Sequence, residues 1–303
     1  MKKVLVIYYS QAGQLKRVMN SFISKLNDEE IYLDIRAIKP KNEYPFPWPF
    51  YTFFDEFPES VFMDGCEIDE LENISDDYDL IILGYTVWYM APAIPITAFL
   101  QSEQAKKIFK NKPVVTVVAC RDMWITAQEK VKQKLNELEA KHIDHVSFVD
   151  QSGSVLSLIT LPTYMLTGNK KYFSFLPSAG ISDEDINSAD RFGLRLNQAL
   201  HNSQELNYTP LLKNLGACTV NGKLIATERI ANRSFKIWSR FIKFFGSKYS
   251  LGRKFAITIY VVFLIIMLLT LVPINIISRK IINIFQKQKL KEIEDYYEQP
   301  SGR

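Results

Sequence analysis

Short apolar runs alternate with amphipathic segments over the first half of the chain. Residues 4–9 form an apolar run of strand length that stops at Ser10, and a short loop follows it. Beyond the loop, apolar residues recur at steps of three and four, at Leu15, Val18, Met19, Phe22, Ile23 and Leu26. This spacing places them on one face of a helix. The chain is therefore predicted to open with a buried strand that leads straight into an amphipathic helix.

Further strands are predicted downstream. Residues 31–38 alternate apolar and polar positions, which is typical of a half-exposed strand at a sheet edge. Residues 78–85, 113–119 and 146–150 are apolar runs, as expected for strands that are buried on both faces.

Helices are predicted between these strands. One opens at Pro92 and Pro95 and ends near Leu100, and another runs through about Ala140. Strands that alternate with helices predict an α/β fold with a doubly wound parallel sheet, because right-handed crossovers place the helices on both faces.

Residues 41–60 are dense in proline and aromatic residues. Prolines this close together are predicted to prevent both a helix and a central strand. So many aromatic side chains would not be left in water. The segment is interpreted as a lid over a pocket, and the alternative is a structural flap on the core.

Residues 151–228 are predicted to form an extension that closes the sheet and a substrate pocket. Its apolar runs at 155–162 and 173–177 line a channel for alkyl chains or form extra core, and core is the safer interpretation. Ser182 begins a variant capping box. The helix that follows is predicted to close the sheet with four inward residues, Ile186, Ala189, Phe192 and Leu196. Asn221 and Gly222 are predicted to form a turn.

The last quarter, residues 229–303, changes character. Basic residues recur at helical spacing at Arg229, Arg233, Lys236, Arg240 and Lys243. The other side of the same helix carries Ile230, Ser234, Ile237, Trp238, Phe241 and Phe245. This pattern is typical of a helix that lies in a membrane interface.

Residues 255–277 contain no charged side chain. At about 1.5 Å per residue, such a run is long enough to cross a hydrocarbon core of roughly 30 Å. A single span is favoured, and a re-entrant helix kinked at Pro273 is the alternative. The soluble alternative is a buried core helix.

Composition narrows the range of functions. The 303 residues include 47% hydrophobic and 23% charged residues, with a net charge of +4, which is typical of a globular protein and gives no reason to expect a nucleic-acid partner. With three histidines, a metal site is not expected, and His142 and His145 are assigned to a surface connection. No signal peptide is recognised, so the first domain is expected in the cytoplasm. A reducing compartment is indicated by the isolated cysteines Cys66, Cys120 and Cys218.

Candidate chemistry gathers where the parallel strands end. Ligands on doubly wound sheets bind outside the carboxyl ends of the strands, where loops 10–15, 85–91 and 119–124 converge. The first loop has a hydroxyl and a glycine before a helix N-terminus, so it is either a phosphate site or an ordinary turn. The other two carry Trp88, Tyr89 and Trp124. One phosphate-type loop and two aromatic loops would suit a phosphorylated planar cofactor.

Two motifs resemble the flavodoxin-like superfamily over residues 1–150. They are Tyr9-Ser10-Gln11-Ala12-Gly13-Gln14-Leu15 and Tyr78-Asp79-Leu80-Ile81-Ile82-Leu83-Gly84-Tyr85-Thr86-Val87-Trp88-Tyr89. The resemblance implies a flavodoxin-like sheet that binds FMN. The phosphate would be held by Ser10, Gln11, Ala12, Gly13, Gln14 and Leu15, and the ring by Thr86, Val87, Trp88, Tyr89, Ala119, Cys120 and Arg121. Leu15 departs from the hydroxyl residue of many flavodoxins, which makes a low-potential electron carrier less expected.

A narrower resemblance extends to about residue 200. It rests on Tyr44-Pro45-Phe46-Pro47-Trp48, Phe54-Asp55-Glu56-Phe57-Pro58-Glu59-Ser60, Arg121-Asp122-Met123-Trp124, Ala127-Gln128-Glu129-Lys130-Val131 and Met165-Leu166-Thr167-Gly168. These segments are similar to the bacterial dialkylresorcinol condensing enzymes. The resemblance implies that a partner ketosynthase builds a dialkyl cyclohexane-1,3-dione and that this chain aromatises it. Cys120 has no histidine nearby in the sequence to activate it, so flavin chemistry fits better than condensation.

The catalytic hypotheses follow from that substrate. A 1,3-dione would bind largely as an enolate, which Arg121 could stabilise, while Tyr85, Tyr89 or Asp122 handles the proton. Arg121 and Asp122 could equally form a structural ion pair. A membrane-tethered quinone or NAD(P)H reductase and a flavin-free scaffold for the ketosynthase are the alternatives. The expected partners are an alkylated small molecule and membrane lipid, and a homodimer remains open.

Overall fold

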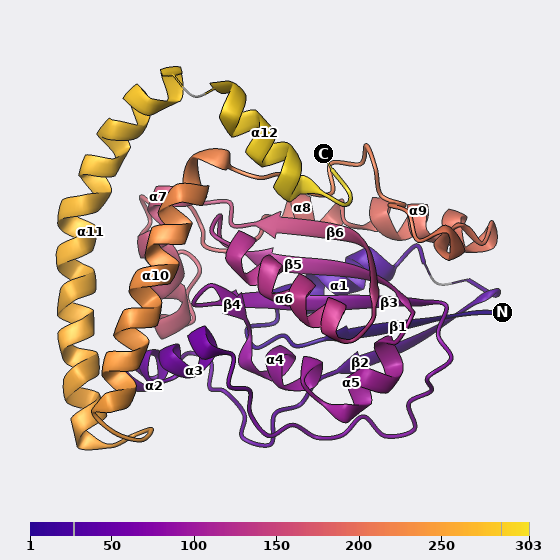
Figure 1. Cartoon of the computed structure of the whole chain (residues 1–303), viewed down its shortest axis with the longest axis horizontal. Helices are drawn as coiled ribbons and strands as arrows, with labels where there is room; N and C mark the ends of the chain where they lie inside the picture. The colour runs from indigo at the N-terminus through magenta and orange to yellow at the C-terminus, as the bar shows by residue number, and fades with distance from the viewer. Residues whose placement is uncertain (27, 286, 303) are drawn as a thin grey trace.

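The sheet is parallel, as its sequence pattern predicts (Figure 1). The computed structural model describes residues 1–26, 28–285 and 287–302. The strands are β1 (Lys2–Tyr8), β2 (Ile31–Ala37), β3 (Leu80–Trp88), β5 (Pro113–Cys120) and β6 (Lys141–Val149), with a short β4 (Ala91–Pro92) antiparallel to the end of β3. Their order is β2-β1-β3-β5-β6, with β4 paired to β3. Counted over the parallel strands alone, this is the 2-1-3-4-5 order of flavodoxin-like folds.

Helices cover both faces of the sheet. One face carries α1 (Gln14–Ile23), α8 (Asp183–Asn187) and α9 (Asp190–His201), and the other carries α4 (Ile94–Leu100), α5 (Glu103–Phe109) and α6 (Ile125–Glu137). Alternation along β1 explains the two cores: Val4 and Val6 pack toward α1, whereas Leu5 and Ile7 pack toward the opposite face. The predicted closing helix is two helices, α8 and α9, and the four residues predicted to face inward, Ile186, Ala189, Phe192 and Leu196, are all buried.

Strand β2 is the predicted edge strand, but its alternation breaks in the middle. Asp34 is buried and Ile35 is exposed. The buried carboxylate accepts hydrogen bonds from the Tyr78 hydroxyl, at 2.6 Å, and from Arg36. These partners satisfy a charge that would otherwise be too costly to bury.

The assignment of His142 and His145 to a surface connection is wrong. Strand β6 begins at Lys141, so both histidines are strand residues, and His145 is fully buried. Thr116 Oγ1 lies 2.9 Å from His142 Nε2 and 2.8 Å from His145 Nδ1. Burial lowers the pKa of His142 to about 3, so these rings stay neutral parts of the core.

The prediction that residues 41–60 contain no helix is also wrong. They form α2 (Phe50–Asp55) and most of α3 (Phe57–Phe62). Pro49 occupies the N-cap of α2, and a proline stands in the first turn of α3. Proline is tolerated there because those amides have no intrahelical acceptor.

The extension holds α7 (Gly153–Thr167) and the short 3-10 helix η1 (Gln204–Asn207). The prediction of extra core for its apolar runs fails on one side of α7. Val155, Leu156 and Ile159 are exposed there, and Phe175 is exposed in the loop that follows.

The last quarter folds back over the carboxyl end of the sheet (Figure 1). It consists of α10 (Gly222–Phe244), α11 (Leu251–Phe285) and α12 (Lys287–Glu298). The predicted turn at Asn221 and Gly222 is instead the start of α10. The segment Leu251–Thr270, with a mean hydropathy of 2.0, is long and apolar enough to cross a membrane. Pro273 and the rest of the predicted span beyond Thr270 have side chains that lie outside the described residues.

The aromatic residues on the predicted interfacial side of α10 are packed inside the protein, whereas Ile230 and Ile237 of that side stay exposed. Phe235 packs on Phe57 of α3, with ring centroids 5.1 Å apart. Trp238 packs on Tyr260 and Phe263 of α11, at 5.3 and 4.7 Å. Burying this face against α3 and α11 removes more apolar surface from water than leaving it on the outside.

The C-terminal residues dock on the edge strand β6. Ser301 Oγ donates to Asp144 Oδ1 at 2.7 Å and accepts from the His145 amide at 2.7 Å. Asp144 is fully buried and also accepts from the amides of Leu211 and Leu212. The tail is therefore part of the folded domain.

Replacing Ser301 by alanine tests this docking. The Ser301→Ala variant should lower the free energy of unfolding by about 1–3 kcal/mol, because it leaves the buried His145 amide without a partner and removes one hydrogen bond from the buried Asp144 carboxylate. Urea unfolding measures the change. The matched Ser247→Ala variant, at an exposed serine, should stay within about 0.5 kcal/mol of the parent. Equal losses in the two variants would contradict the docking.

Candidate functional site

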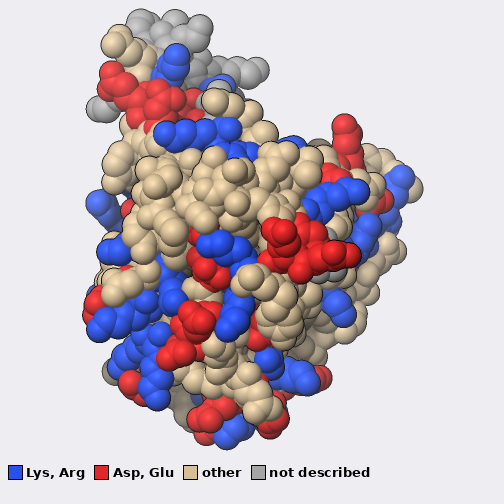
Figure 2. Space-filling model, turned by 90° about the vertical axis from the view of Figure 1, so that its right-hand side faces the viewer, with Lys and Arg blue, Asp and Glu red and all other residues tan. Residues whose placement is uncertain are grey.

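The site lies where β1, β3 and β5 end, at the end of the molecule that α2, α3, α7 and α10 cover (Figure 1). The loops after these three strands meet there, as the topology of a parallel sheet requires. The opposite end, shown in Figure 2, carries interspersed acidic and basic residues of the kind expected for an ordinary solvent-facing surface.

The loop after β1 has the geometry of an anion site. Gly13 stands at the N-cap of α1 with a φ of 78°, and no atom lies within 4 Å of where its Cβ would be. Ser10 Oγ accepts a hydrogen bond from the Lys16 amide at 3.1 Å. The amides of Gln14 and Leu15 come before the first intrahelical hydrogen bond, so they are available to an anion. Leu15 itself points into the core and is buried.

The two glutamines of this loop tie it to its surroundings. Gln11 Nε2 donates to the Pro45 carbonyl at 2.6 Å, and its Oε1 accepts from Trp48 Nε1 at 3.1 Å. Gln14 Oε1 accepts from the Ile181 amide at 3.3 Å. Its buried Nε2 has no partner among the described residues. A buried donor without a partner beside a free helix N-terminus is a feature that a bound anion would satisfy.

The aromatic residues of the second loop lie under the segment 44–57. Trp88 is 9% exposed, and the rings of Tyr9, Tyr44 and Trp48 pack on it edge to face at 6.0, 5.0 and 5.4 Å. The Tyr89 hydroxyl donates to the Phe53 carbonyl at 2.6 Å. The segment 44–57 thus covers both predicted ring-stacking residues.

Tyr85, Thr86 and Val87 precede this loop, and they differ in burial and in contacts. Tyr85 is fully buried, and its hydroxyl donates to Gln128 of α6. This position gives Tyr85 a role in the core and lends no support to its prediction as a proton carrier. The Thr86 carbonyl accepts from the Ala93 amide at 2.9 Å and so closes the β3–β4 turn, while Val87 is half-buried.

The third loop gathers polar groups around Ser154, near the start of α7. Arg121 Nη2 donates to the Ser154 carbonyl at 2.9 Å, and Asp122 accepts from the Ser154 hydroxyl. Arg121 and Asp122 are therefore linked through Ser154, and in the described part of the chain no salt bridge joins them directly. Arg121 Nε is buried without a partner among the described residues, and burial lowers the pKa of this side chain.

Two other residues of this loop are parts of the core. Cys120 follows Ala119 at the end of β5, and burial raises the pKa of its thiol well above the ordinary value. The thiol therefore stays protonated and is a poor nucleophile. Trp124 is buried against His145, with ring centroids 4.9 Å apart.

Glu228 is a site residue that the sequence analysis missed. It comes from α10, is buried, and its Oε1 accepts from the Thr126 amide at 2.5 Å, at the N-terminus of α6. Its Oε2 and the neighbouring Asn232 Oδ1 are buried without partners among the described residues. Burial raises the pKa of Glu228, although the hydrogen bond from Thr126 and, to a smaller extent, the Arg121 guanidinium oppose the shift. Glu228 is the sole acidic residue in the sequence of α10, and that isolation was the available signal.

Among solved structures, the chain is similar to several flavoproteins and to a flavodoxin. A flavoprotein from Lactobacillus acidophilus NCFM, solved in complex with FMN, is 24% identical over 52% of this chain and 97% of that chain, with a TM-score of 0.37. Flavodoxin 1 from Bacillus cereus is 15% identical over 63% of this chain and 95% of that chain, with a TM-score of 0.35. A WrbA-like protein from Agrobacterium tumefaciens is 12% identical over 67% of this chain and 99% of that chain, also with a TM-score of 0.35.

At these identities and TM-scores, no function is inferred from the likeness. No protein-family model matches the chain, and no curated protein matches it.

The pH dependence of stability tests the environment of Glu228. A carboxyl with a raised pKa binds its proton more tightly in the folded chain, so stability should fall as the pH rises from about 4.3 toward neutrality. In Glu228→Gln the amide oxygen can still accept from Thr126, but this loss should disappear. Urea unfolding across that pH range should show a growing advantage for the variant. Glu29→Gln, at an exposed residue, should follow the parent. Parallel curves for all three proteins would contradict the buried position of Glu228.

Proposed function

We propose that this chain is an FMN-dependent oxidoreductase that acts on a lipid-like substrate. The observation that carries the proposal is the left-handed, unobstructed Gly13 at the N-terminus of α1, next to the Ser10 hydroxyl. Only such a loop lets a phosphate approach the backbone closely. The loop has no partner motif for an adenine half, which favours FMN over a dinucleotide.

The residues present fit the phosphate of FMN as they stand, whereas the ring requires a rearrangement. The phosphate would be held by Ser10 and the loop amides, with the unpartnered Gln14 Nε2 as a further donor. The ring would lie against Trp88 or Tyr89, with Thr86, Val87 and Ala119 to Arg121 at its edges. Since Tyr44 and Trp48 now pack on Trp88, ring binding requires the segment 44–57 to move aside.

Bound FMN would supply a hydride acceptor at this edge of the sheet. Arg121 would stabilise an anionic substrate, because its guanidinium is held by one carbonyl and has a buried N–H to spare. Asp122, oriented by Ser154, and Glu228, whose pKa is raised, are the carboxyl groups available to hold or move a proton. Tyr89 is engaged with Phe53 and would serve only once the segment 44–57 moves.

We further propose a specific reaction, which rests on the sequence resemblance. A dialkyl cyclohexane-1,3-dione would lose two hydrogens from its ring to become a dialkylresorcinol. Its enolate would pair with Arg121, one C–H would leave as a hydride and the neighbouring C–H as a proton. A ketosynthase that makes the dione is the proposed partner. We also propose that the chain associates with a membrane and keeps its flavin domain in the cytoplasm, since such substrates partition into lipid.

One observation favours a second candidate. The packing of Tyr44 and Trp48 on Trp88 would suit a chain that binds no flavin and only places a ketosynthase at the membrane. A flavin absorption spectrum of the purified protein separates this scaffold from the enzyme.

Substitution of Gly13 tests the cofactor site. Gly13→Leu should weaken FMN binding at least about tenfold, because a side chain there blocks phosphate hydrogen bonds worth about 1.5–3 kcal/mol each. Fluorescence titration of FMN measures the affinity. Gly216→Leu is the matched control, since Gly216 has a similar φ of 63° and equally open surroundings. If both variants bind FMN alike, the phosphate site is elsewhere.

Anaerobic mixing with a synthetic alkylated cyclohexane-1,3-dione tests the chemistry. The protein should bleach FMN and release the resorcinol, and Arg121→Ala should slow this half-reaction by about 100-fold, as expected for a lost anion donor. FMN affinity should change much less. The control Arg195→Ala removes a cation from α9 and should leave the rate unchanged. Bleaching with NAD(P)H but not with diones would favour a quinone or NAD(P)H reductase instead.

A further inference from the structure

The outward face of α11 is a continuous apolar stripe. The stripe consists of Phe255, Ile259, Val262, Ile266 and Leu269, which are 36–69% exposed and recur at alternating steps of four and three. At that spacing the side chains form one line along the helix. In water, apolar side chains over several turns of the helix would be exposed to solvent, which is unusual for a soluble protein.

The inward face of the same helix is already occupied. Ala256, Ile257 and Tyr260 are buried in one cluster with Phe57 and Ile242. The rings of Phe57 and Tyr260 stack at 4.6 Å. The first half of α11, as far as Leu264, is thus packed against α10 and α3 (Figure 1).

The first turn of α11 is clamped by buried charges. Arg253 is 2% exposed, and its guanidinium contacts the Glu59 carboxylate at 2.5 and 3.0 Å and Asp55 Oδ1 at 2.5 Å. Lys248, in the turn before α11, pairs with the buried Glu56 at 2.8 Å. These contacts hold the start of α11 against α2 and α3.

The segment after α11 returns to the same domain. Glu294 and Glu298 of α12 accept hydrogen bonds from the amides of Gly222 and Val220, at 2.9 and 3.2 Å, and Ser301 reaches Asp144. The segments at both ends of α11 are therefore attached to the same folded domain. A single span would place α12 across a hydrocarbon core of roughly 30 Å, where none of these bonds can form.

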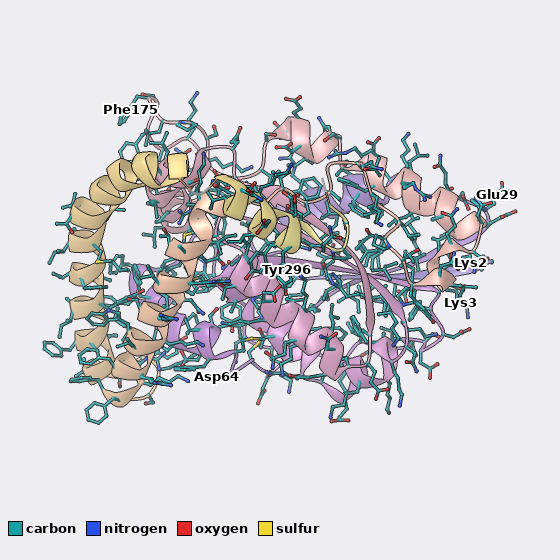
Figure 3. The ribbon with its side chains drawn as sticks, turned by 45° about the horizontal axis from the view of Figure 1, so that its top comes forward. Lys2, Lys3, Glu29, Asp64, Phe175 and Tyr296 are labelled. Carbon is teal, nitrogen blue, oxygen red and sulfur yellow. The ribbon has the colours of Figure 1, made fainter. Side chains whose placement is uncertain are left out.

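Cations lie on α10, the helix that packs against α11. The exposed surface of α10 carries Arg229, Arg233, Lys236 and Arg240, interleaved with exposed Ile230, Ile237 and Phe244. Lys254 is exposed next to Phe255. Phe175 projects at the same end of the molecule (Figure 3), as does α7. Two copies joined through this end would bring like charges together, whereas anionic headgroups would neutralise them.

We propose that this end of the molecule binds one leaflet of an anionic bilayer, with α11 lying in the membrane plane and both of its ends on the cytoplasmic side. The stripe on α11 enters the acyl boundary, and the cations of α10 contact the headgroups. Helix α2 and the start of α3 belong to the segment 44–57, which covers Trp88, and they also contact α11. An alkylated molecule in the leaflet would therefore lie next to the site. Bilayer binding itself does not depend on flavin.

Flotation of the full chain with lipid vesicles tests the binding. The protein should float with phosphatidylcholine vesicles that contain phosphatidylglycerol, and much less with phosphatidylcholine alone. The triple variant Val262→Asn, Ile266→Asn, Leu269→Asn should lose at least about tenfold in partitioning, because it removes three exposed apolar side chains without touching the packed face. The control Leu194→Asn, Leu206→Asn changes exposed leucines elsewhere and should float like the parent.

Charge variants test the headgroup contact. Arg233→Gln, Lys236→Gln, Arg240→Gln should weaken binding to anionic vesicles by roughly fivefold per cation and leave the weak binding to neutral vesicles unchanged. If the parent does not float but forms a dimer that the stripe variant dissociates, the face is an interface between copies and the proposal is overturned.

Topology in cells distinguishes an in-plane helix from a span. Cysteines introduced at Glu29 and Asp295 mark the domain and the tail, and both positions are exposed. The unsubstituted chain, with its own Cys66, Cys120 and Cys218, gives the background labelling to subtract. In intact spheroplasts a membrane-impermeant maleimide should label neither Glu29→Cys nor Asp295→Cys, and lysis should expose both. Labelling of Asp295→Cys alone before lysis would show that α11 crosses the membrane and would overturn the in-plane arrangement.

Discussion

The buried contact of Arg253 with Asp55 and Glu59 is the interaction on which the site end of the molecule depends. It joins the first turn of α11 to α2 and α3. Helix α2 and the start of α3 belong to the segment 44–57, which covers Trp88 and Tyr89. Burying the charges of Arg253 and Asp55 is favourable only when they are paired, and loss of one partner leaves the other uncompensated. The position of α11 and the closure of the site are therefore linked through one ion cluster.

The C-terminal quarter is consequently packed against the sheet domain as part of the same fold. Glu228 of α10 satisfies the N-terminus of α6, and Ser301 satisfies the buried Asp144 on β6. Each contact meets a polar group that the sheet or its helices would otherwise leave unpaired in the interior. In a doubly wound sheet, ligands bind outside the carboxyl edge of the strands. In this chain the last quarter encloses that edge and adds a carboxyl group next to Arg121.

Local pattern was sufficient for the parallel sheet and its flanking helices, because buried strands and amphipathic helices have distinct periods in the sequence. The pattern failed where tertiary contacts override it. His142 and His145 are polar in the sequence but pair with Thr116 inside the sheet, and aromatic residues of α10 pack on α3 and α11. The phosphate-type loop could be found because a glycine before a helix is a local signal. Glu228 could not be assigned, because its partner Thr126 is 102 residues away.

Hydrogen exchange on adding FMN tests most directly whether this enclosed edge is the cofactor site. Amides of residues 10–16 should gain protection as the phosphate engages them. Residues 44–57 should exchange faster in the same experiment, because the ring displaces Tyr44 and Trp48 from Trp88. Protection confined to other segments, or no change in either region at saturating FMN, would contradict the location of the site.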